Sequence, residues 1–286
     1  MNGDGTVAYL FGGRGRDGAS NELWAFDLAA DSWSLVTQTI DTPIPQPRFG
    51  HTATWVPDVG LVIWSGQRDA DFFADIWAWN TSANQWIELQ SLGAVPAARY
   101  GSCASLGPDG QLWISHGFTQ DTGRFADTRS YDFETGSWTD RTAVDRIPVE
   151  RCLHDCFWSS NGQLILYGGQ TTGVAALGDI WAYDLATGAW TNGAAPSAPP
   201  RQLYALAGDA AGAAVFGGGS TDGGFLADMW MIDPQTLALA PIEVGPGPSA
   251  RSGATLVRDP TRSRLLLFGG INGEGALGDL WELGLP

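Results

Sequence analysis

The sequence predicts an all-β protein, a six-bladed β-propeller in which each blade is a four-stranded antiparallel sheet. Three patterns carry this prediction, and each recurs about every 50 residues. They are a short apolar run that ends in glycine, an apolar run that follows an acidic residue, and a tryptophan shortly after a turn aspartate. Because a repeat of this length marks one supersecondary unit, the six copies predict six stacked sheets.

The glycine-ended runs are expected to form the second strand of each blade, counted outward from the centre as A, B, C and D. Tyr9–Gly13 is the first copy, with the sequence Tyr-Leu-Phe-Gly-Gly. Runs of four to seven β-branched and aromatic residues bounded by glycine are typical of strands. The six copies end at Gly13, Gly66, Gly117, Gly169, Gly218 and Gly270.

A second apolar run follows each glycine pair and is expected to form strand C. Asp179-Ile-Trp-Ala-Tyr-Asp184 is the clearest copy. Six residues after the closing Asp or Asn, a large apolar residue returns in strand D, and we expect it to pack between blades. These residues are Trp33, Trp86, Trp138, Trp190 and Leu239. A proline-containing stretch and an arginine then introduce strand A of the next blade.

One blade cannot cover its own apolar faces, so the sheets are expected to close into a ring. The chain is interpreted as a single domain over residues 1–286. The predicted blades span about 6–38, 46–90, 97–140, 149–192, 199–244 and 249–285.

The glycine pair, the tryptophan six residues past a turn aspartate, and the aromatic-Asp strand end together resemble the kelch repeat. The resemblance covers about residues 6–285, in the variant of about 50 residues with Asp before Leu-Trp. It implies a kelch β-propeller and leaves the function open, because one fold hosts many functions.

The two ends of the chain do not complete their blades. Strand A of the first blade and strand D of the last have no counterpart in the sequence, which leaves 22 strands where 24 are expected. The alternatives are a shortened sequence, a strand donated by something else, or an unusual closure. The first is preferred, because an absent inner strand would leave edge groups unpaired beside the channel.

Composition excludes several classes of function. The net charge is −16, with 15 arginines and no lysine, and such a surface repels nucleic acid. No apolar run is long enough for membrane insertion. Neither a secretory signal nor a disulfide framework is expected, so a cytoplasmic location is slightly favoured, while the compartment and the oligomeric state stay open. Cys103 could reach Cys152 or Cys156 only across blades.

Five arginines stand at the start of strand A and are candidate anion contacts at the mouth of the channel. In kelch adaptors that resemble this chain, arginines at this position bind an acidic peptide. An aspartate recurs in step with each of them, so the alternative is a structural Arg–carboxylate pair in every blade. The arginines are Arg48, Arg99, Arg151, Arg201 and Arg251, and the aspartates are Asp75, Asp127, Asp179, Asp228 and Asp279.

The loops between strands B and C vary most, and loops on a rigid scaffold usually carry specificity. They are 14–20, 67–74, 118–126, 170–178, 220–227 and 271–278. In blades 2 and 3 they hold aromatic residues beside arginines, which is typical of interface anchors. These candidate binding residues are Arg68, Phe72, Phe73, Phe118, Arg124 and Phe125.

Blades 3 and 4 deviate from the repeat. His116 replaces Gly or Ser, and Arg129 stands where other blades have Trp. Cys152, His154 and Cys156 alternate along one strand, which spreads the outer two too far apart to share a metal, so no metal site is predicted.

The sequence contains no nucleophile elbow, phosphate-binding loop or zinc-protease motif, so we predict no catalytic residues and no cofactor. The preferred function is a protein- or peptide-binding scaffold that uses the B–C loop face. One alternative is a small-molecule or carbohydrate site at the channel mouth, with or without enzymatic activity, in which Arg99, His116 and Arg151 are polar contacts. The other is a structural subunit of a larger assembly.

Overall fold

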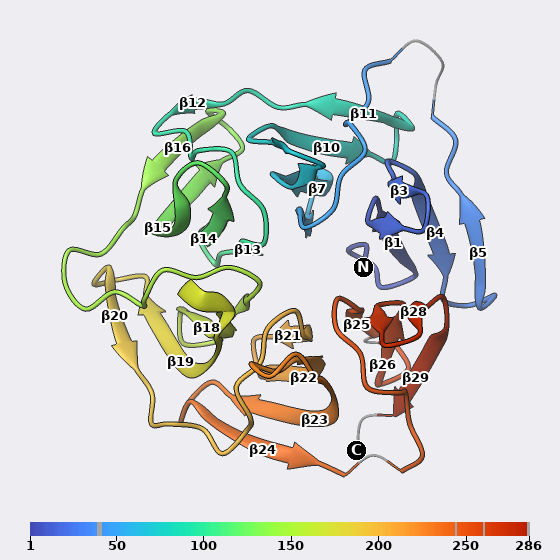
Figure 1. Cartoon of the computed structure of the whole chain (residues 1–286). Coiled ribbons are helices and arrows are strands. Elements are labelled where there is room, and N and C mark those ends of the chain that lie inside the picture. The colour runs from blue at the N-terminus through green and yellow to red at the C-terminus, as the bar shows by residue number, and fades with distance from the viewer. Residues whose placement is uncertain (39–41, 244, 260, 285–286) are drawn as a thin grey trace.

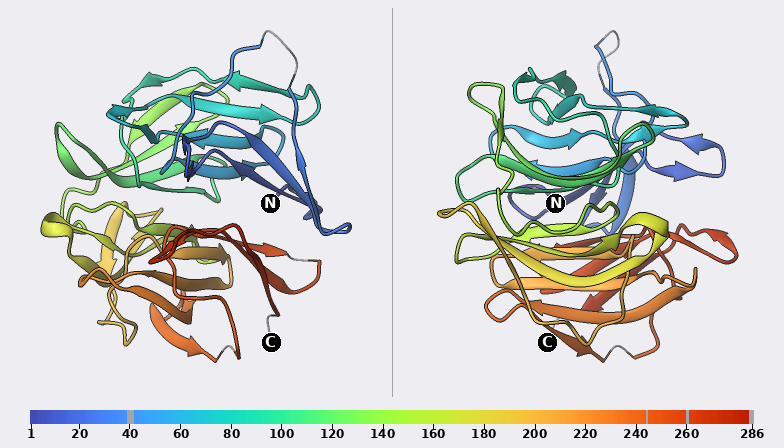
Figure 2. Two further views of the ribbon diagram at one scale, coloured as in Figure 1. Left: turned by 45° about the vertical axis from the view of Figure 1, so that its right-hand side comes forward. Right: turned by 60° about the vertical axis from the view of Figure 1, so that its left-hand side comes forward.

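The computed structural model describes residues 1–38, 42–243, 245–259 and 261–284. Six small antiparallel sheets stand in a ring, and the first and last sheets along the chain are neighbours (Figure 1). Two further views show the same sheets obliquely (Figure 2). In the described residues the only helical element is a single 3₁₀ turn, η1 (Thr172–Val174). The prediction of an all-β, six-bladed propeller is confirmed.

Blades 1 and 2 occupy the N-terminal part of the ring. Blade 1 contains β1 (Val7–Phe11), β4 (Leu23–Asp27) and β5 (Ser32–Leu35), with the ribbon β2 (Arg14–Gly15) and β3 (Gly18–Ala19). Blade 2 contains β6 (Thr52–Val56), β7 (Gly60–Trp64), β10 (Ile76–Asn80) and β11 (Gln85–Glu88), with the ribbon β8 (Gln67–Arg68) and β9 (Asp71–Phe72).

Blades 3 and 4 have long B and C strands. Blade 3 contains β13 (Cys103–Leu106), β14 (Leu112–Thr119), β15 (Gly123–Asp132) and β16 (Ser137–Asp140), with β12 (Leu92–Gly93) added in parallel to β16. Blade 4 contains β17 (Asp155–Trp158), β18 (Gln163–Gln170), β19 (Ala176–Asp184) and β20 (Ala189–Asn192). The fifth strand of blade 3 is not predicted by the repeat.

Blades 5 and 6 complete the ring. Blade 5 contains β21 (Ala205–Asp209), β22 (Gly212–Gly219), β23 (Phe225–Asp233) and β24 (Ala238–Ile242). Blade 6 contains β25 (Thr255–Asp259), β26 (Arg264–Phe268) and β29 (Leu280–Gly284), with the ribbon β27 (Ile271–Asn272) and β28 (Gly275–Ala276). The ends of the predicted fifth and sixth blades, residues 244 and 285, lie outside the described residues.

The terminal blades are three-stranded in the described residues, as the repeat predicts. Blade 1 has the order β1-β4-β5 and so begins with strand B, whereas blade 6 has the order β25-β26-β29 and stops at strand C. The loops predicted between B and C are instead extensions of the hairpin: short ribbons in blades 1, 2 and 6, and continuations of the B and C strands in blades 3 to 5.

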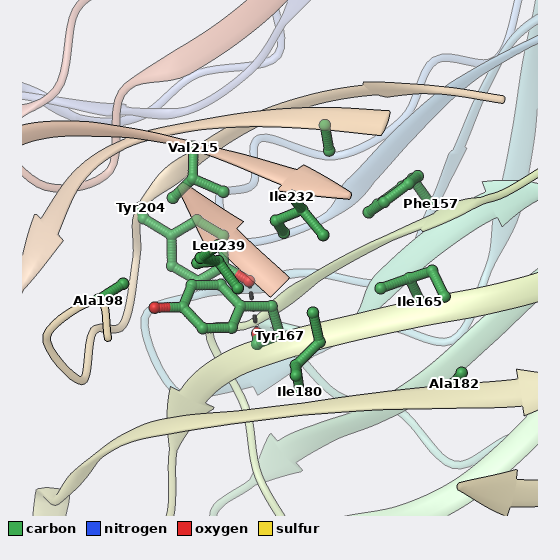
Figure 3. Packing of buried hydrophobic residues seen from close by; sticks show 11 residues of the cluster. Phe157, Ile165, Tyr167, Ile180, Ala182, Ala198, Tyr204, Val215, Ile232 and Leu239 are labelled. Atoms are coloured by element: carbon green, nitrogen blue, oxygen red, sulfur yellow. Dashed lines mark hydrogen bonds between the residues drawn. The ribbon is translucent and has the colours of Figure 1, made fainter. Parts of the chain in front are cut away.

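The core lies between blades because both faces of each B strand are covered by neighbouring sheets. In β18, Leu164, Ile165 and Leu166 are all fully buried. Ile165 and Tyr167 pack against Val215 of blade 5 (Figure 3), whereas Leu164 and Leu166 face Trp113 of blade 3. Burying both faces of a strand in this way provides most of the favourable free energy of ring closure.

The strand D tryptophans pack between blades, as predicted. Between ring centroids, Trp86 lies 4.9 Å from Phe11 of blade 1, and Trp138 lies 5.6 Å from Trp64 of blade 2. Within their own blades, Trp86 lies 5.6 Å from Trp79 and Trp190 lies 5.3 Å from Tyr183. Trp86, Trp138 and Trp190 are buried. The tilted and edge-to-face geometry is the favourable one for aromatic pairs.

Candidate functional site

The five arginines at the start of strand A are buried and paired with the five aspartates at the start of strand C. Arg151 is typical: its two terminal nitrogens donate to the two carboxylate oxygens of Asp179, both at 2.7 Å. Its remaining N–H groups bond the carbonyls of Gly168 and Val149. The arginine side chains are at most 1% exposed and most of their N–H groups are bonded to acceptors within the blade, so this placement favours the structural interpretation of the pairs. The pairs are Arg48–Asp75, Arg99–Asp127, Arg151–Asp179, Arg201–Asp228 and Arg251–Asp279.

The aspartates of these pairs also accept a hydrogen bond from the tryptophan two residues later. In blade 4, Trp181 Nε1 donates to Asp179 at 2.6 Å. In blade 3 the tryptophan is replaced by Arg129, whose Nε donates to Asp127 at 3.2 Å. The deviation noted in the sequence at Arg129 therefore preserves the same contact with a different donor. The hydrogen bond from Arg251 lowers the pKa of Asp279 to about 2, although burial acts in the opposite direction.

Two of the candidate aromatic residues cover these buried arginines. The ring of Phe73 lies 4.2 Å from the Arg48 guanidinium carbon, and the ring of Phe125 lies 3.7 Å from that of Arg99. Both rings are half-buried. Cation–π contact explains their position, since an aromatic face attracts a desolvated guanidinium.

The residue that follows each buried arginine lies at the mouth of the channel and differs from blade to blade. In each case it forms an isolated antiparallel bridge with the residue at the start of the B–C extension. This position was not predicted from the repeat because its residue type follows no pattern, although the residue before it is the arginine that recurs in five blades. The five residues are Phe49, Tyr100, Cys152, Gln202 and Ser252.

Aromatic side chains gather on the blade 2 and 3 side of this mouth. We define the aromatic arc as Phe49, Phe72, Tyr100 and Phe118. Tyr100 is central, with ring centroids 6.4 Å from Phe49, 6.1 Å from Phe72 and 5.7 Å from Phe118. All four rings are half-buried, so each keeps part of its surface open to solvent.

Arginines flank the aromatic arc at both ends. The guanidinium of Arg14 lies 5.3 Å from the Phe49 ring, and that of Arg124 lies 5.5 Å from the Phe118 ring. Arg68 lies in the blade 2 ribbon, where it donates to Gln46 at 2.8 Å and to Asp71 at 3.1 Å. Of the candidate binding residues, Phe72, Phe118 and Arg124 therefore meet at one patch, and Arg68 lies in the ribbon that carries Phe72.

The blade 4 and 5 side of the mouth is polar. Arg124 Nε donates to the Gln170 backbone carbonyl at 3.0 Å, and its terminal nitrogen bonds the Gln170 side chain. The Gln170 amide in turn donates to Gln202. Cys152 has a free, buried thiol that lies 3.9 Å from the side-chain oxygen of Gln170, and burial raises the pKa of this thiol. We define Arg124, Gln170 and Gln202 as the amide arc.

The candidate contact His116 does not face the mouth. It is fully buried between blades 3 and 4, where its ring lies 5.5 Å from that of His154 and its Nδ1 lies 2.6 Å from Ser115 Oγ. Burial lowers the pKa of His116 to about 3 and that of His154 well below its usual value. Burial also lowers the pKa of His51 to about 3.

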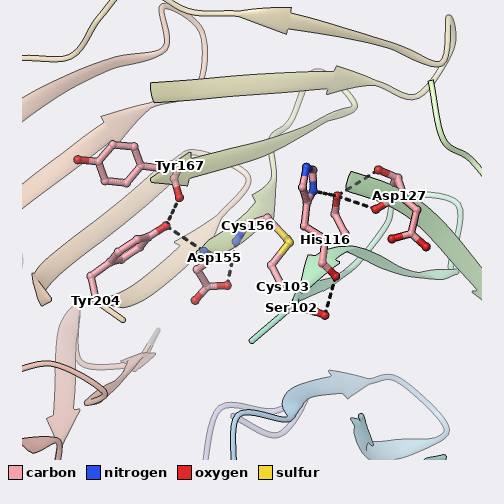
Figure 4. Close-up of a disulfide and its surroundings, with 10 residues drawn as sticks. Ser102, Cys103, His116, Asp127, Asp155, Cys156, Tyr167 and Tyr204 are labelled. Atoms are coloured by element: carbon pink, nitrogen blue, oxygen red, sulfur yellow. Dashed lines mark hydrogen bonds between the residues drawn. A yellow bond between two sulfur atoms is a disulfide. The ribbon is translucent and has the colours of Figure 1, made fainter. Parts of the chain in front are cut away.

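Cys103 and Cys156 form a disulfide (Figure 4), although the three cysteines predicted no disulfide framework. Their Cα atoms are 5.6 Å apart, because β13 and β17 are neighbouring inner strands of blades 3 and 4. The bond links two blades, as expected from the sequence, because Cys103 could reach another cysteine only in a different blade. Disulfides are rare in cytosolic proteins, so the cysteines no longer support a cytoplasmic location.

Among the residues that the structure describes, no three His, Cys, Asp or Glu side chains are grouped closely enough to hold a metal ion. Nor does any helix in this part of the chain have the length and apolar character needed to cross a membrane.

The ring of six sheets around a central channel defines the class of the protein as a six-bladed β-propeller. Comparison with known proteins gives the family. A sequence model of the KLHDC2/KLHL20/DRC7 Kelch-repeats domain matches residues 1–162 and 130–286. The chain therefore belongs to the kelch-repeat β-propeller family.

Relatives in several organisms are similar to this chain. Kelch domain-containing protein 3 of Rattus norvegicus is 28% identical over 222 residues, covering 72% of this chain and 56% of the relative. Tip elongation aberrant protein 1 of Schizosaccharomyces pombe is 29% identical over 63% of the chain and 16% of its own length. Rab9 effector protein with kelch motifs of Xenopus laevis is 24% identical over 66% of the chain and 54% of its own length. The chain thus spans about half, or less, of these relatives.

Proposed function

We propose that this propeller is a protein- or peptide-binding scaffold and that the aromatic arc on the B–C face is its recognition surface. The observation that carries the proposal is the break in symmetry at the mouth. Five blades share the buried Arg–Asp pair, whereas the residue beside each arginine changes in every one of them. Function on a repeat scaffold is expected where the repeats differ, because recognition of one partner needs an asymmetric surface.

The chemistry of the arc suits an apolar anchor from a partner. Half-exposed aromatic rings whose backbone is held by bridges and short ribbons bury a large area at little entropic cost, as in the hot spots of protein interfaces. Arg14 and Arg124 at its ends, with the Gln170 and Gln202 amides beyond, offer donors to the backbone carbonyls or carboxylates of the bound segment.

The family supports an interaction role, since kelch propellers typically act as protein-interaction scaffolds, and the Xenopus relative is named as an effector of Rab9. Binding is favoured over catalysis by the state of the histidines. His51, His116 and His154 are buried with lowered pKa values, so none is poised as a general base near neutral pH.

Selection from a random dodecapeptide phage library on the purified propeller tests the proposal. We expect enrichment of peptides with a large apolar residue, and binding of their synthetic versions that falls at least tenfold in Phe72→Ala. A library that yields no binders, or only binders insensitive to Phe72→Ala and Tyr100→Ala, would contradict the proposal.

A carbohydrate or other small polar molecule is the second candidate ligand. It is favoured by the juxtaposition of stacking rings with the side-chain amides of Gln170 and Gln202 at one mouth. A glycan array probed with the same protein separates the two, because glycan binding that requires Gln170, without any peptide hit, would replace the first proposal by this one.

A further inference from the structure

A cavity lies between blades 5 and 6, at the turn that joins strands A and B of blade 5. Its volume is about 200 Å³. The walls come from β21, β22 and β23 of blade 5 and from β25 and β26 of blade 6, which are neighbours in the ring (Figure 1). Ala214 and Leu265 are buried in these walls, whereas Ala211, in the turn, and Arg258 are exposed to solvent. The cavity is therefore accessible from outside.

The cavity exists because one cross-strand row of blade 5 has small side chains. In each complete blade, paired residues of strands A, B and C form a row that faces the next blade. In blade 4 the row begins with Phe157 and Ile165, which pack against blade 5 (Figure 3). In blade 5 the same two positions are Ala207 and Ala214. Two alanines thus stand where the preceding seam holds an aromatic and a branched side chain.

The strand B member of this row is smallest in blade 5. A residue larger than alanine occupies the position in each of the other blades, and close packing of such seams is the rule in protein interiors. The six residues, in blade order, are Tyr9, Val62, Trp113, Ile165, Ala214 and Leu266. Because a space left in a core costs packing energy, its presence at one seam alone indicates a place for a ligand.

The size and the walls of the cavity suit a compact apolar group. An apolar cavity of about 150 Å³ is enough to bind benzene. The present space is somewhat larger, and its buried walls are the aliphatic side chains of Ala214 and Leu265. The thioether of Met231, which is half-buried, completes the wall on the strand C side and adapts readily to an aromatic ring.

Arg258 adds hydrogen-bond donors at the opening. Among the described residues that line the cavity, it alone carries a charge. One of its terminal nitrogens bonds Asp209, in an ion pair that is 42% and 40% exposed. Within the described part of the chain, no acceptor contacts its other N–H groups. A guanidinium with free N–H groups is suited to bind a carboxylate, and Asp209 need not move for this to happen.

From these observations we propose that the seam between blades 5 and 6 binds a small monocarboxylic acid whose apolar part is about the size of a benzene ring. The apolar part occupies the space beside Ala214 and Leu265, and the carboxylate accepts hydrogen bonds from Arg258. The A–B turn and the aromatic arc lie at opposite ends of the inner strands. The site is therefore separate from the arc, and this proposal and the proposed function can fail independently.

Methyl NMR on the intact protein, labelled with carbon-13 at the methionine methyl groups, tests the proposal. The chain has three methionines, of which Met231 lines the cavity. The probe is 3-phenylpropanoate, and 3-phenylpropanamide, which has the same ring without the charge, is the control ligand. We expect the acid to shift the Met231 signal saturably while the Met1 signal stays in place. The amide should bind at least fivefold more weakly, because it lacks the charge-assisted hydrogen bonds.

Three variants assign the binding to the cavity. Arg258→Gln should weaken the acid at least fivefold and leave the amide within twofold. Arg262→Gln is the matched control, since Arg262 is 41% exposed and is also paired with an aspartate, and it should leave the acid within twofold. Ala214→Leu fills the cavity and should abolish the shift of the Met231 signal, while its thermal midpoint shows that the variant is folded.

The outcomes that would overturn the proposal are distinct. A Met231 signal that does not move at millimolar concentrations of the acid would mean that the cavity binds no such ligand. Equal binding of the acid and the amide, unchanged in Arg258→Gln, would remove the role of the carboxylate. A shift that persists in folded Ala214→Leu would place the ligand elsewhere. If Ala214→Leu does not fold, the comparison of Arg258→Gln with Arg262→Gln decides alone.

Discussion

The buried Arg–Asp pairs and the residues beside them differ although they are adjacent in the sequence. Arg99 and Arg151 have the same partners, burial and geometry. Tyr100 and Cys152, one residue later, share only their backbone bridge: one is a half-exposed ring and the other a buried thiol. A position that repeats in every blade stabilises the ring, whereas a position that varies is free to recognise a partner. The predictions below test this division.

The largest expected effect is the loss of stability in acid, because the histidines lie in the buried layer and not at the mouth. Burial keeps the pKa values of His51 and His116 at about 3, and that of His154 well below normal, whereas the unfolded chain titrates near 6.5. Between these values the unfolded state binds more protons, so stability falls as the pH falls below about 6.5. At pH 5, His51 and His116 should each lower the free energy of unfolding by about 2 kcal/mol relative to pH 7.5, and His154 acts in the same direction.

Denaturant unfolding between pH 5 and 8 measures this dependence. Gln cannot be protonated in this range. Replacing His116 by Gln should therefore reduce the number of protons taken up on unfolding by about one, which makes the slope of the free energy of unfolding against pH shallower. A free energy of unfolding that is flat between pH 5 and 7.5 would contradict the buried, neutral state of the histidines.

Breaking one buried pair should have the next largest effect. In Arg151→Ala the carbonyls of Gly168 and Val149 lose their donor and Asp179 loses its partner, so the free energy of unfolding should fall by about 4 kcal/mol. Arg258→Ala, in an ion pair that is exposed on both sides, is the matched control and should cost less than about 1 kcal/mol. Equal losses in the two variants would argue against a structural role of the repeated arginines.

The disulfide between blades 3 and 4 is expected to contribute about 4 kcal/mol, since it closes a loop of 53 residues. Thermal unfolding with and without reductant measures the difference. The double variant Cys103→Ala, Cys156→Ala should unfold at the same lowered temperature in both buffers. A wild-type midpoint that does not respond to reductant, with the thiols shown to be free, would mean that the disulfide adds nothing to ring stability.

The fold could be predicted from the sequence because each blade repeats its own signals. The C strand that begins at Asp179 and the D strand that carries Trp190 have similar counterparts in almost every blade. The missing first and last strands were therefore visible as gaps in the series. The fifth strand of blade 3 was not predicted, because Leu92–Gly93 pairs with β16 through backbone contacts that leave no side-chain pattern.

The candidate site was predicted in part. The repeat predicted that Arg48 and Asp75 are important, but it did not predict whether the Arg48 guanidinium faces the channel or the sheet. That orientation depends on the Phe73 ring, which covers the guanidinium. Phe72 and Phe118 could be predicted because they lie in the variable B–C loops, whereas Phe49 and Tyr100 could not, because they belong to no such loop. His116 was expected at the mouth, and its left-handed backbone, with φ of 58°, accompanies its place between blades 3 and 4.

The smallest expected change in stability is at Phe72. Phe72 belongs to the aromatic arc, and the next residue, Phe73, covers Arg48. Phe72→Ala should change the free energy of unfolding by less than about 1 kcal/mol, because its ring is only half-buried in a two-residue ribbon strand. Phe73→Ala should cost about 2 kcal/mol, because it uncovers a buried cation.

The affinity of these two adjacent variants for a library-selected peptide, measured with their thermal midpoints, tests the central claim most directly. The account predicts that Phe72→Ala loses at least tenfold in affinity with an almost unchanged midpoint, and that Phe73→Ala keeps its affinity while its midpoint falls. The reverse result, with Phe72→Ala unfolding early and still binding peptide as tightly as the wild type, would contradict it.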